Sequence, residues 1–138
     1  MLISTKGRYA LRIMIDLARH GDQGTIPLKE IAERQGISEK YLEAIIKLLV
    51  THQLVSGTRG KNGGYVLSRD PAEVTAWDVI SVTENDFVAV SCLSPDAAVC
   101  ERASACATLP MWRAFNEEIR QFFQQYTIEA LAKQADRL

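Results

Sequence analysis

The sequence predicts a mainly α-helical fold with one short β-hairpin, arranged as a winged helix–turn–helix and followed by a long C-terminal helix. Two segments, 28–35 and 39–52, repeat apolar residues at helical spacing and are separated by a turn at Gly36. Two β-prone segments around a glycine-rich tip follow at once, as in a hairpin. A length of 138 residues with 47% hydrophobic content supports one buried core with an appended arm, and is too short for two ordinary domains.

The first predicted helix begins at Ser4 or Thr5, either of which can cap it, and is expected to end at Gly21. Its apolar stripe indicates packing against the helix–turn–helix; the stripe is formed by Tyr9, Ala10, Ile13, Met14, Leu17 and Ala18. After a loop at 22–24, Pro27 is expected near the first turn of the next helix, where its fixed φ is compatible with helix formation.

The helix–turn–helix itself is predicted from residues on both sides of Gly36. This glycine can take the positive φ of a tight turn, and Ser38 can cap the second helix. The second helix places apolar residues on one side, namely Leu42, Ile45, Ile46 and Leu49, and charged residues on the other, namely Glu39, Lys40, Glu43 and Lys47. A polar helix surface on such a scaffold is suited to the major groove of DNA.

The hairpin is expected to be the wing, with strands near 54–55 and 64–67 and the tip at 59–63. Arg59 and Lys61 at this tip can reach an adjacent minor groove or its phosphates. A charged glycine turn is, taken alone, more typical of a solvated loop than of a DNA contact. Its place directly after a recognition-type helix favours the DNA-binding interpretation.

The second half of the chain is predicted to be less regular. Thr75 and Asp78 resemble a capping box for a short helix over 76–84, and 85–107 shows no regular pattern. Thr108 is expected to cap a long helix over 109–126, and a short helix restarts at Thr127. The long helix carries Met111, Trp112, Phe115, Ile119, Phe122, Phe123 and Tyr126 on a heavily apolar face. Dimerisation is favoured for this face over burial within one chain, because helix–turn–helix proteins commonly bind two half-sites.

The sequence therefore predicts a DNA-binding domain over 1–84, a cysteine-bearing sensor loop over 85–107, and a dimerisation helix with a C-terminal tail over 108–138. Charge supports the division: residues 1–70 hold 11 lysines and arginines against 7 acidic residues, while residues 71–138 hold 5 against 10. A basic half suits phosphate binding, although an asymmetry of this size also occurs by chance. Charged residues interrupt the N-terminal apolar pattern, so a cytoplasmic protein without a membrane partner is expected.

The three cysteines form the second candidate site. The chain has three cysteines, Cys92, Cys100 and Cys106, separated by seven and five residues. An odd number of thiols in a cytoplasmic protein does not favour a framework of structural disulfides. Thiolates are soft ligands for zinc, copper(I) or iron–sulfur clusters, and zinc is less favoured because paired CxxC motifs are missing. Chemically acceptable fourth ligands are His20, His52, Asp86, Asp96 and Glu101. Three ordinary loop cysteines without metal are the alternative.

Several of these segments together resemble the Rrf-type bacterial transcription regulators, whose members include IscR-, NsrR-, RirA- and CymR-like proteins. The similarity covers LISTKGRYALRIMIDLA, IPLKEIAERQGISEKYLEAIIKLLVTHQLVSGTRGKNGGYVLSRD, the three cysteines and the MW pair that follows them, and the RG–GGY wing is its most specific part. The resemblance implies a dimeric winged-helix repressor or activator bound to a double-stranded DNA operator. It places Ser38, Lys40, Tyr41 and Glu43 on the DNA, with Arg59 and Gly60 in the wing.

The resemblance also implies a [2Fe–2S] or [4Fe–4S] cluster, which can be lost on purification, held by Cys92, Cys100 and Cys106. IscR-like members have a ligand histidine three residues after the last cysteine, where this chain has Leu109. NsrR-like members use an aspartate where this chain has Arg8, and the first cysteine gap is seven residues instead of five. The fourth ligand therefore stays open.

Four functional hypotheses follow. The first is a homodimeric DNA-binding regulator, controlled by an iron–sulfur cluster that senses cluster supply, redox state or nitric oxide. The second keeps the DNA-binding function and replaces the cluster by cysteine oxidation or a regulatory protein partner. An enzyme with Cys100 or Cys106 as nucleophile is disfavoured, because both histidines lie in predicted helices of the DNA-binding half. A winged helix that binds only protein is the fourth.

The predicted DNA-contact set is Ser38, Lys40, Tyr41, Glu43, Lys47, Arg59, Gly60 and Lys61. Within it, the role of Glu43 has three interpretations. Its carboxylate can accept a hydrogen bond from cytosine, reject competing sequences, or pair with Lys47 four residues later.

Overall fold

The computed structural model describes residues 2–138 and confirms the predicted fold class. Within these residues the chain forms six α-helices and a two-stranded antiparallel sheet: α1 (Thr5–Arg19), α2 (Leu28–Gln35), α3 (Glu39–Thr51), β1 (Val55–Thr58), β2 (Gly64–Leu67), α4 (Ala76–Thr83), α5 (Leu109–Gln124) and α6 (Ile128–Ala135). Short 3₁₀ turns lie at Gly21–Gln23, Ser91–Leu93 and Ala103–Ala105. Every predicted helix is present, and the ends differ from the predictions by only a few residues.

Side-chain caps explain where most helices begin. Ser4 accepts a hydrogen bond from the Gly7 backbone N–H, and Ser38 accepts one from Tyr41, as predicted for α1 and α3. Both halves of the predicted Thr75–Asp78 capping box are also formed. Thr127 caps α6 in the same way.

The expected cap at Thr108 was wrong. Its side chain makes no capping hydrogen bond to α5, and its backbone already has helical angles (φ −93°, ψ −11°). The Thr108 hydroxyl instead lies 3.5 Å from the sulfur of Cys106. This side chain therefore belongs to the cysteine loop and not to a helix cap.

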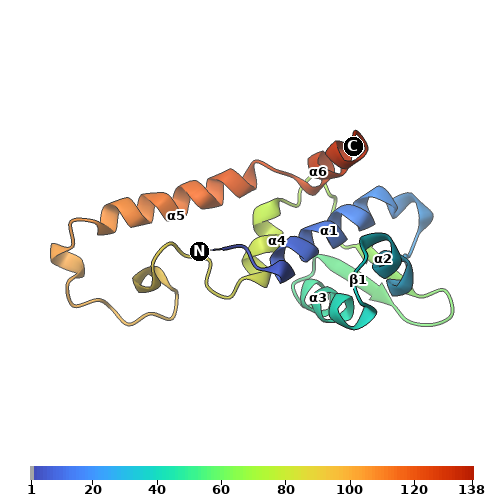
Figure 1. Cartoon of the computed structure of the whole chain (residues 1–138), viewed down its shortest axis with the longest axis horizontal. Helices are drawn as coiled ribbons and strands as arrows, with labels where there is room; N and C mark the ends of the chain where they lie inside the picture. The colour runs from blue at the N-terminus through green and yellow to red at the C-terminus, as the bar shows by residue number, and fades with distance from the viewer. Residues whose placement is uncertain (1) are drawn as a thin grey trace.

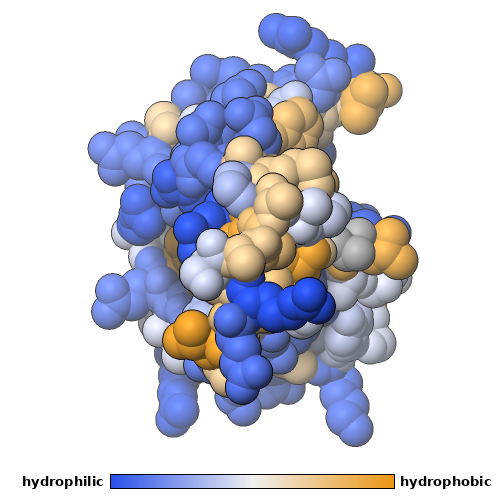
Figure 2. Space-filling model, turned by 90° about the vertical axis from the view of Figure 1, so that its left-hand side faces the viewer, coloured by the Kyte–Doolittle hydropathy of each residue, from blue (hydrophilic) through white to orange (hydrophobic). Residues whose placement is uncertain are grey.

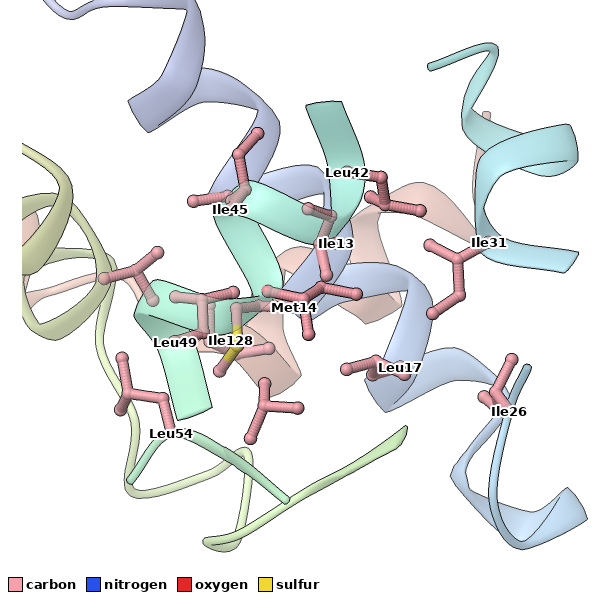
Figure 3. Packing of buried hydrophobic residues seen from close by; sticks show 14 of the residues in the cluster. Ile13, Met14, Leu17, Ile26, Ile31, Leu42, Ile45, Leu49, Leu54 and Ile128 are labelled. Atoms are coloured by element: carbon pink, nitrogen blue, oxygen red, sulfur yellow. The ribbon is translucent and has the colours of Figure 1, made fainter. Parts of the chain in front are cut away.

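The core lies where α1 crosses the helix–turn–helix (Figure 3). Ile13, Met14 and Leu17 of α1 are buried against Leu42 and Ile45 of α3, and α2 and the wing complete the cluster. Each fully buried side chain of this size contributes about 1.5–3 kcal/mol of transfer free energy. The core consequently fixes the recognition helix on one side and leaves its other side exposed.

The wing is anchored to the segment that precedes α2. β1 and β2 pair from Val55↔Leu67 to Thr58↔Gly64, and Ile26 forms an isolated bridge with Tyr65 through two backbone hydrogen bonds of 2.8 and 3.0 Å. At the tip, the Thr25 hydroxyl donates to the Asn62 carbonyl at 2.9 Å. These contacts hold the hairpin beside the recognition helix.

α5 extends away from this core, and the irregular segment 85–108 lies along it and turns back at its far end (Figure 1). The chain then returns to the core, because α6 packs on α1 and Ile128 is fully buried. A bridge between Thr75 and Thr127 joins the start of α4 to the start of α6. Among residues 2–138, no helix has the length and apolar character needed to cross a bilayer.

Candidate nucleic-acid interface and cysteine cavity

The exposed side of α3 carries the predicted recognition residues. Ser38, Lys40, Tyr41, Glu43 and Lys47 are all exposed. Tyr41 is anchored by an edge-to-face contact with Tyr9 of α1, with ring centroids 5.8 Å apart. These side chains are therefore accessible and half of the helix remains available to a large partner.

The wing and α3 form one groove of about 410 Å³. Glu43 and Lys47 line it from the helix, and Arg59 lines it from the wing. Gly60 has a φ of +109°, which favours glycine at this position in the tip, and both Gly60 and Lys61 are exposed. The structure thus brings recognition helix and wing residues to the same face.

Glu43 makes no ion pair with Lys47 in the part of the chain that the structure describes. Both side chains instead face the groove beside Arg59. The carboxylate and the two cations are accordingly free to meet polar groups of a ligand. The interpretation of Glu43 as the partner of Lys47 loses support.

An ion pair between exposed Arg34 and buried Asp16 fixes the first helix of the motif to α1. Asp16 is 2% exposed and accepts hydrogen bonds from Arg34 at 2.7 and 3.0 Å and from the Gln35 side chain at 2.9 Å. The hydrogen bond to Asp16 raises the pKa of Arg34 above its ordinary value, so the guanidinium stays charged. Sequence reasoning missed this pair, although an aspartate within an apolar stripe was a visible signal.

The three cysteines line one cavity of about 220 Å³ between the loop and the start of α5. The other walls are mainly small or aliphatic: Leu93, Ala97, Ala98, Val99, Ala103 and Leu109, with Arg113 as the charged lining residue. Within residues 2–138, no three histidine, cysteine or acidic side chains are grouped closely enough to hold a metal ion. The cavity therefore gathers three soft donors, which must move closer to bind one centre.

Local contacts fasten this loop to α5. The Ala89 backbone N–H donates to the Asn116 side chain at 2.7 Å, and the ring of Phe87 packs on Phe123 with centroids 6.0 Å apart. Hydrogen bonds from the Thr108 hydroxyl and from the Thr108 and Leu109 backbones lower the pKa of the Cys106 thiol. Cys106 is thus the cysteine whose surroundings favour the thiolate.

One side of α5 is apolar and uncovered. No α5 residue is fully buried, and Met111, Phe115 and Phe122 are 53%, 45% and 51% exposed. An apolar groove of about 460 Å³ runs between this face and Phe87. Figure 2 looks at the end of the molecule where α5 begins, and hydrophobic atoms run over the centre of that face between hydrophilic flanks.

Comparison with known proteins identifies the family. The family model Rrf2, described as an iron-dependent transcriptional regulator, matches residues 3–134. The chain belongs to the Rrf2 family. Its resemblance to Rrf-type regulators is thereby confirmed, and as an Rrf2 protein it is a DNA-binding transcription regulator and not an enzyme.

Relatives of this Rrf2 regulator match over its full length. It is 38% identical over 138 residues to the HTH-type transcriptional regulator IscR of Xenorhabdus nematophila, covering 100% of this chain and 83% of that protein. Among solved structures, CymR, the global cysteine regulator of B. subtilis, matches with a TM-score of 0.76 at 36% identity, covering 97% of this chain and 98% of CymR. T. potens IscR matches with a TM-score of 0.74 at 36% identity over 98% and 88% of the two chains.

Proposed function

We propose that this Rrf2 regulator binds DNA as a homodimer and that an iron–sulfur cluster at Cys92, Cys100 and Cys106 controls its affinity for the operator. The single observation that carries the proposal is the cavity at the N-terminal end of α5, because all three cysteines line it. Residues 85–107 are then the sensor loop between the DNA-binding domain of 1–84 and the dimerisation segment of 108–138.

The DNA contacts are proposed to be Ser38, Lys40, Tyr41, Glu43, Lys47, Arg59, Gly60 and Lys61. Their exposure, and the groove shared by α3 and the wing, support this set. α3 would enter the major groove, while Arg59 and Lys61 reach the adjacent minor groove or its phosphates. Operator specificity is assigned to α3 and general affinity to the wing.

The dimer is proposed to form through the uncovered face of α5. Exposed Phe115 and Phe122 beside an apolar groove are a patch that a partner copy would bury. A two-fold pair presents two recognition helices to two half-sites, whose separation must match one helical turn of DNA. Small changes at the cysteine end of α5 can then alter that separation.

The chemistry of the donors fits a cluster. The cavity offers three soft thiols and lacks a histidine or carboxylate among its described lining residues, so a soft iron–sulfur centre is preferred there to a hard cation. A bound cluster would supply a redox-active centre sensitive to its surroundings. The cysteines would hold it, and the Asn116 contact with Ala89 would tie the ordered loop to α5.

The test is absorption spectroscopy with iron and sulfide analysis on protein isolated without oxygen. We expect a visible absorption band with stoichiometric iron and sulfide, both lost in Cys92→Ala, Cys100→Ala and Cys106→Ala. Cys92 and Cys106 flank the cavity from different parts of the loop, so each substitution is an independent check. A colourless wild-type protein without iron or sulfide would contradict cluster binding.

Cysteine oxidation is the second candidate. The lowered pKa of Cys106 favours the reactive thiolate, and a related solved structure, 34% identical with a TM-score of 0.72, is the oxidized form of S. aureus CymR. This candidate predicts that metal-free protein binds the operator and that peroxide changes its affinity. Replacement of Cys106 by Ser would remove that response.

A further inference from the structure

Arg12 of α1 contacts the end of α2 directly and is linked to the start of α3 through two aromatic rings. Its guanidinium donates through Nε to the side-chain oxygen of Gln35 at 3.0 Å, and through Nη2 to the Gln35 backbone carbonyl. Gln35 is the last residue of α2, so this carbonyl belongs to the group that a helix leaves without an internal partner. A cation at this end also complements the helix dipole.

The same guanidinium reaches α3 through two aromatic rings. The central carbon of the Arg12 guanidinium lies 5.0 Å from the centroid of the Tyr9 ring, a distance typical of a cation–π contact. Tyr9 in turn holds Tyr41 by the edge-to-face contact at 5.8 Å. Tyr41 is in the first turn of α3 and is 37% exposed.

The Gln35 side chain, which accepts a hydrogen bond from Arg12, is itself held in place. The Gln35 amide nitrogen donates to the buried carboxylate of Asp16, which forces the Gln35 oxygen toward Arg12. The turn between the helices is held by buried Ile37, whose backbone N–H donates to the Ala32 carbonyl at 3.2 Å, while Gly36 and Ser38 on either side of it are exposed. Arg12 thus adds a side-chain link from the end of α2, through Tyr9, to Tyr41 at the start of α3.

We propose that Arg12 is a positioning residue for DNA recognition: it sets the Tyr41 ring and the start of α3 in the orientation that reads the operator. The inference rests on the proposed DNA face. Arg12 acts through Tyr9 and Gln35, and does not need to touch DNA. The positive charge of Arg12 therefore matters less than the planar shape of its guanidinium, which stacks on Tyr9 while it donates hydrogen bonds to two oxygens. Lysine has the charge and lacks this planar group.

The experiment compares Arg12→Lys with wild type on two DNA duplexes. One duplex is selected from a random pool by the wild-type protein, and the other has the same composition in scrambled order. We expect Arg12→Lys to weaken binding to the selected duplex by about tenfold, the order expected when one cation–π contact and one hydrogen bond are lost. Binding to the scrambled duplex and the salt dependence should stay unchanged, because the charge is kept.

Two further variants make the result decisive. Arg19→Lys is the matched control, since Arg19 is exposed on the same helix and pairs with Asp136 far from the turn; we expect it to bind both duplexes as wild type does. Tyr9→Leu keeps an apolar side chain and should reproduce the selective loss. Unfolding temperatures of all three verify that they are folded.

The inference would be overturned if Arg12→Lys bound the selected duplex as tightly as the wild-type protein does. Equal losses on both duplexes in Arg12→Ala, with the salt slope reduced by about one, would overturn it in favour of a direct phosphate contact. Failure of the wild-type protein to select any duplex would instead contradict the proposed DNA face.

Discussion

At the scale of single residues, Cys106 and Thr108 show how the start of α5 shapes thiol chemistry. The Thr108 hydroxyl, predicted to cap the helix, is directed to the Cys106 sulfur, and nearby backbone N–H groups reinforce the effect. A lowered pKa means that more of the thiol is ionised at a given pH below the ordinary value of 9.0. Thiolate is the form that attacks alkylating reagents and binds metal.

Thr108→Val should raise the pKa of Cys106 and slow its alkylation near neutral pH. The measurement is the rate of alkylation against pH in reduced, metal-free protein that retains Cys106 as its single cysteine. We expect the midpoint of that profile to move to higher pH, because valine keeps the shape of threonine and removes its hydroxyl. A parallel chain that retains only Cys100 should show no movement, and an unmoved midpoint for Cys106 would contradict the assigned role of Thr108.

Gly64 controls how closely the wing approaches the core. A Cβ atom added at Gly64 would lie 2.5 Å from backbone atoms of Ile26, which are held in the bridge to Tyr65. Gly64→Ala should therefore destabilise the protein by about 1–3 kcal/mol through overpacking, measured by denaturant unfolding. Gly21→Ala, where added atoms meet nothing within 4 Å, is the control and should leave the unfolding free energy nearly unchanged. Equal stability of the two variants would contradict the close approach.

At the scale of elements, the helices were predictable because their signals are local. Ser38 and the Thr75–Asp78 box mark helix starts within four residues, and Gly36 has the predicted positive φ of +63°. The contacts that build the two candidate sites join distant parts of the chain. Asn116 meets Ala89 across 27 positions, and Arg34 meets Asp16 across 18.

The packing of α6 on the core is a second contact between distant parts of the chain that the sequence could not predict. Ile128 is fully buried beside α1, which lies more than a hundred residues earlier in the sequence. Apolar periodicity predicts that a helix has a buried side, and does not say which element covers it. For this reason the sequence predicted three cysteines on a loop, while their common cavity with Arg113 required the fold.

A charge placed on the apolar face of α5 is expected to disrupt the proposed dimer. Phe122→Glu places a charge in the middle of the apolar face, and we expect it to convert a dimer into monomers because a buried unpaired charge is strongly unfavourable. Gln124→Glu adds the same charge elsewhere on the helix, at an exposed position outside the groove, and should leave the dimer intact. Light scattering after gel filtration measures both masses. A monomeric wild type, or a dimeric Phe122→Glu, would contradict the proposed interface.

At the scale of the whole molecule, the two sites lie apart along the chain's longest dimension. The recognition helix and wing belong to the helical body, and the cysteine loop lies at the end of α5 that is far from that body (Figure 1). Energetic coupling between the two sites requires a structural element whose conformational equilibrium both sites shift. A pair of crossed α5 helices in the proposed dimer would be such an element. The basic first half of the chain would face DNA while the acidic second half carries the sensor.

The most direct test of this account measures operator affinity before and after the cluster is removed from the same anaerobic preparation. For wild type we predict that the affinity for the selected duplex changes by about 5- to 150-fold, the usual range of coupling between two sites. The variant lacking Cys92, Cys100 and Cys106 should still bind the duplex, with an affinity that the same treatment leaves unchanged. Wild-type affinity that is identical with and without the cluster would contradict the central claim.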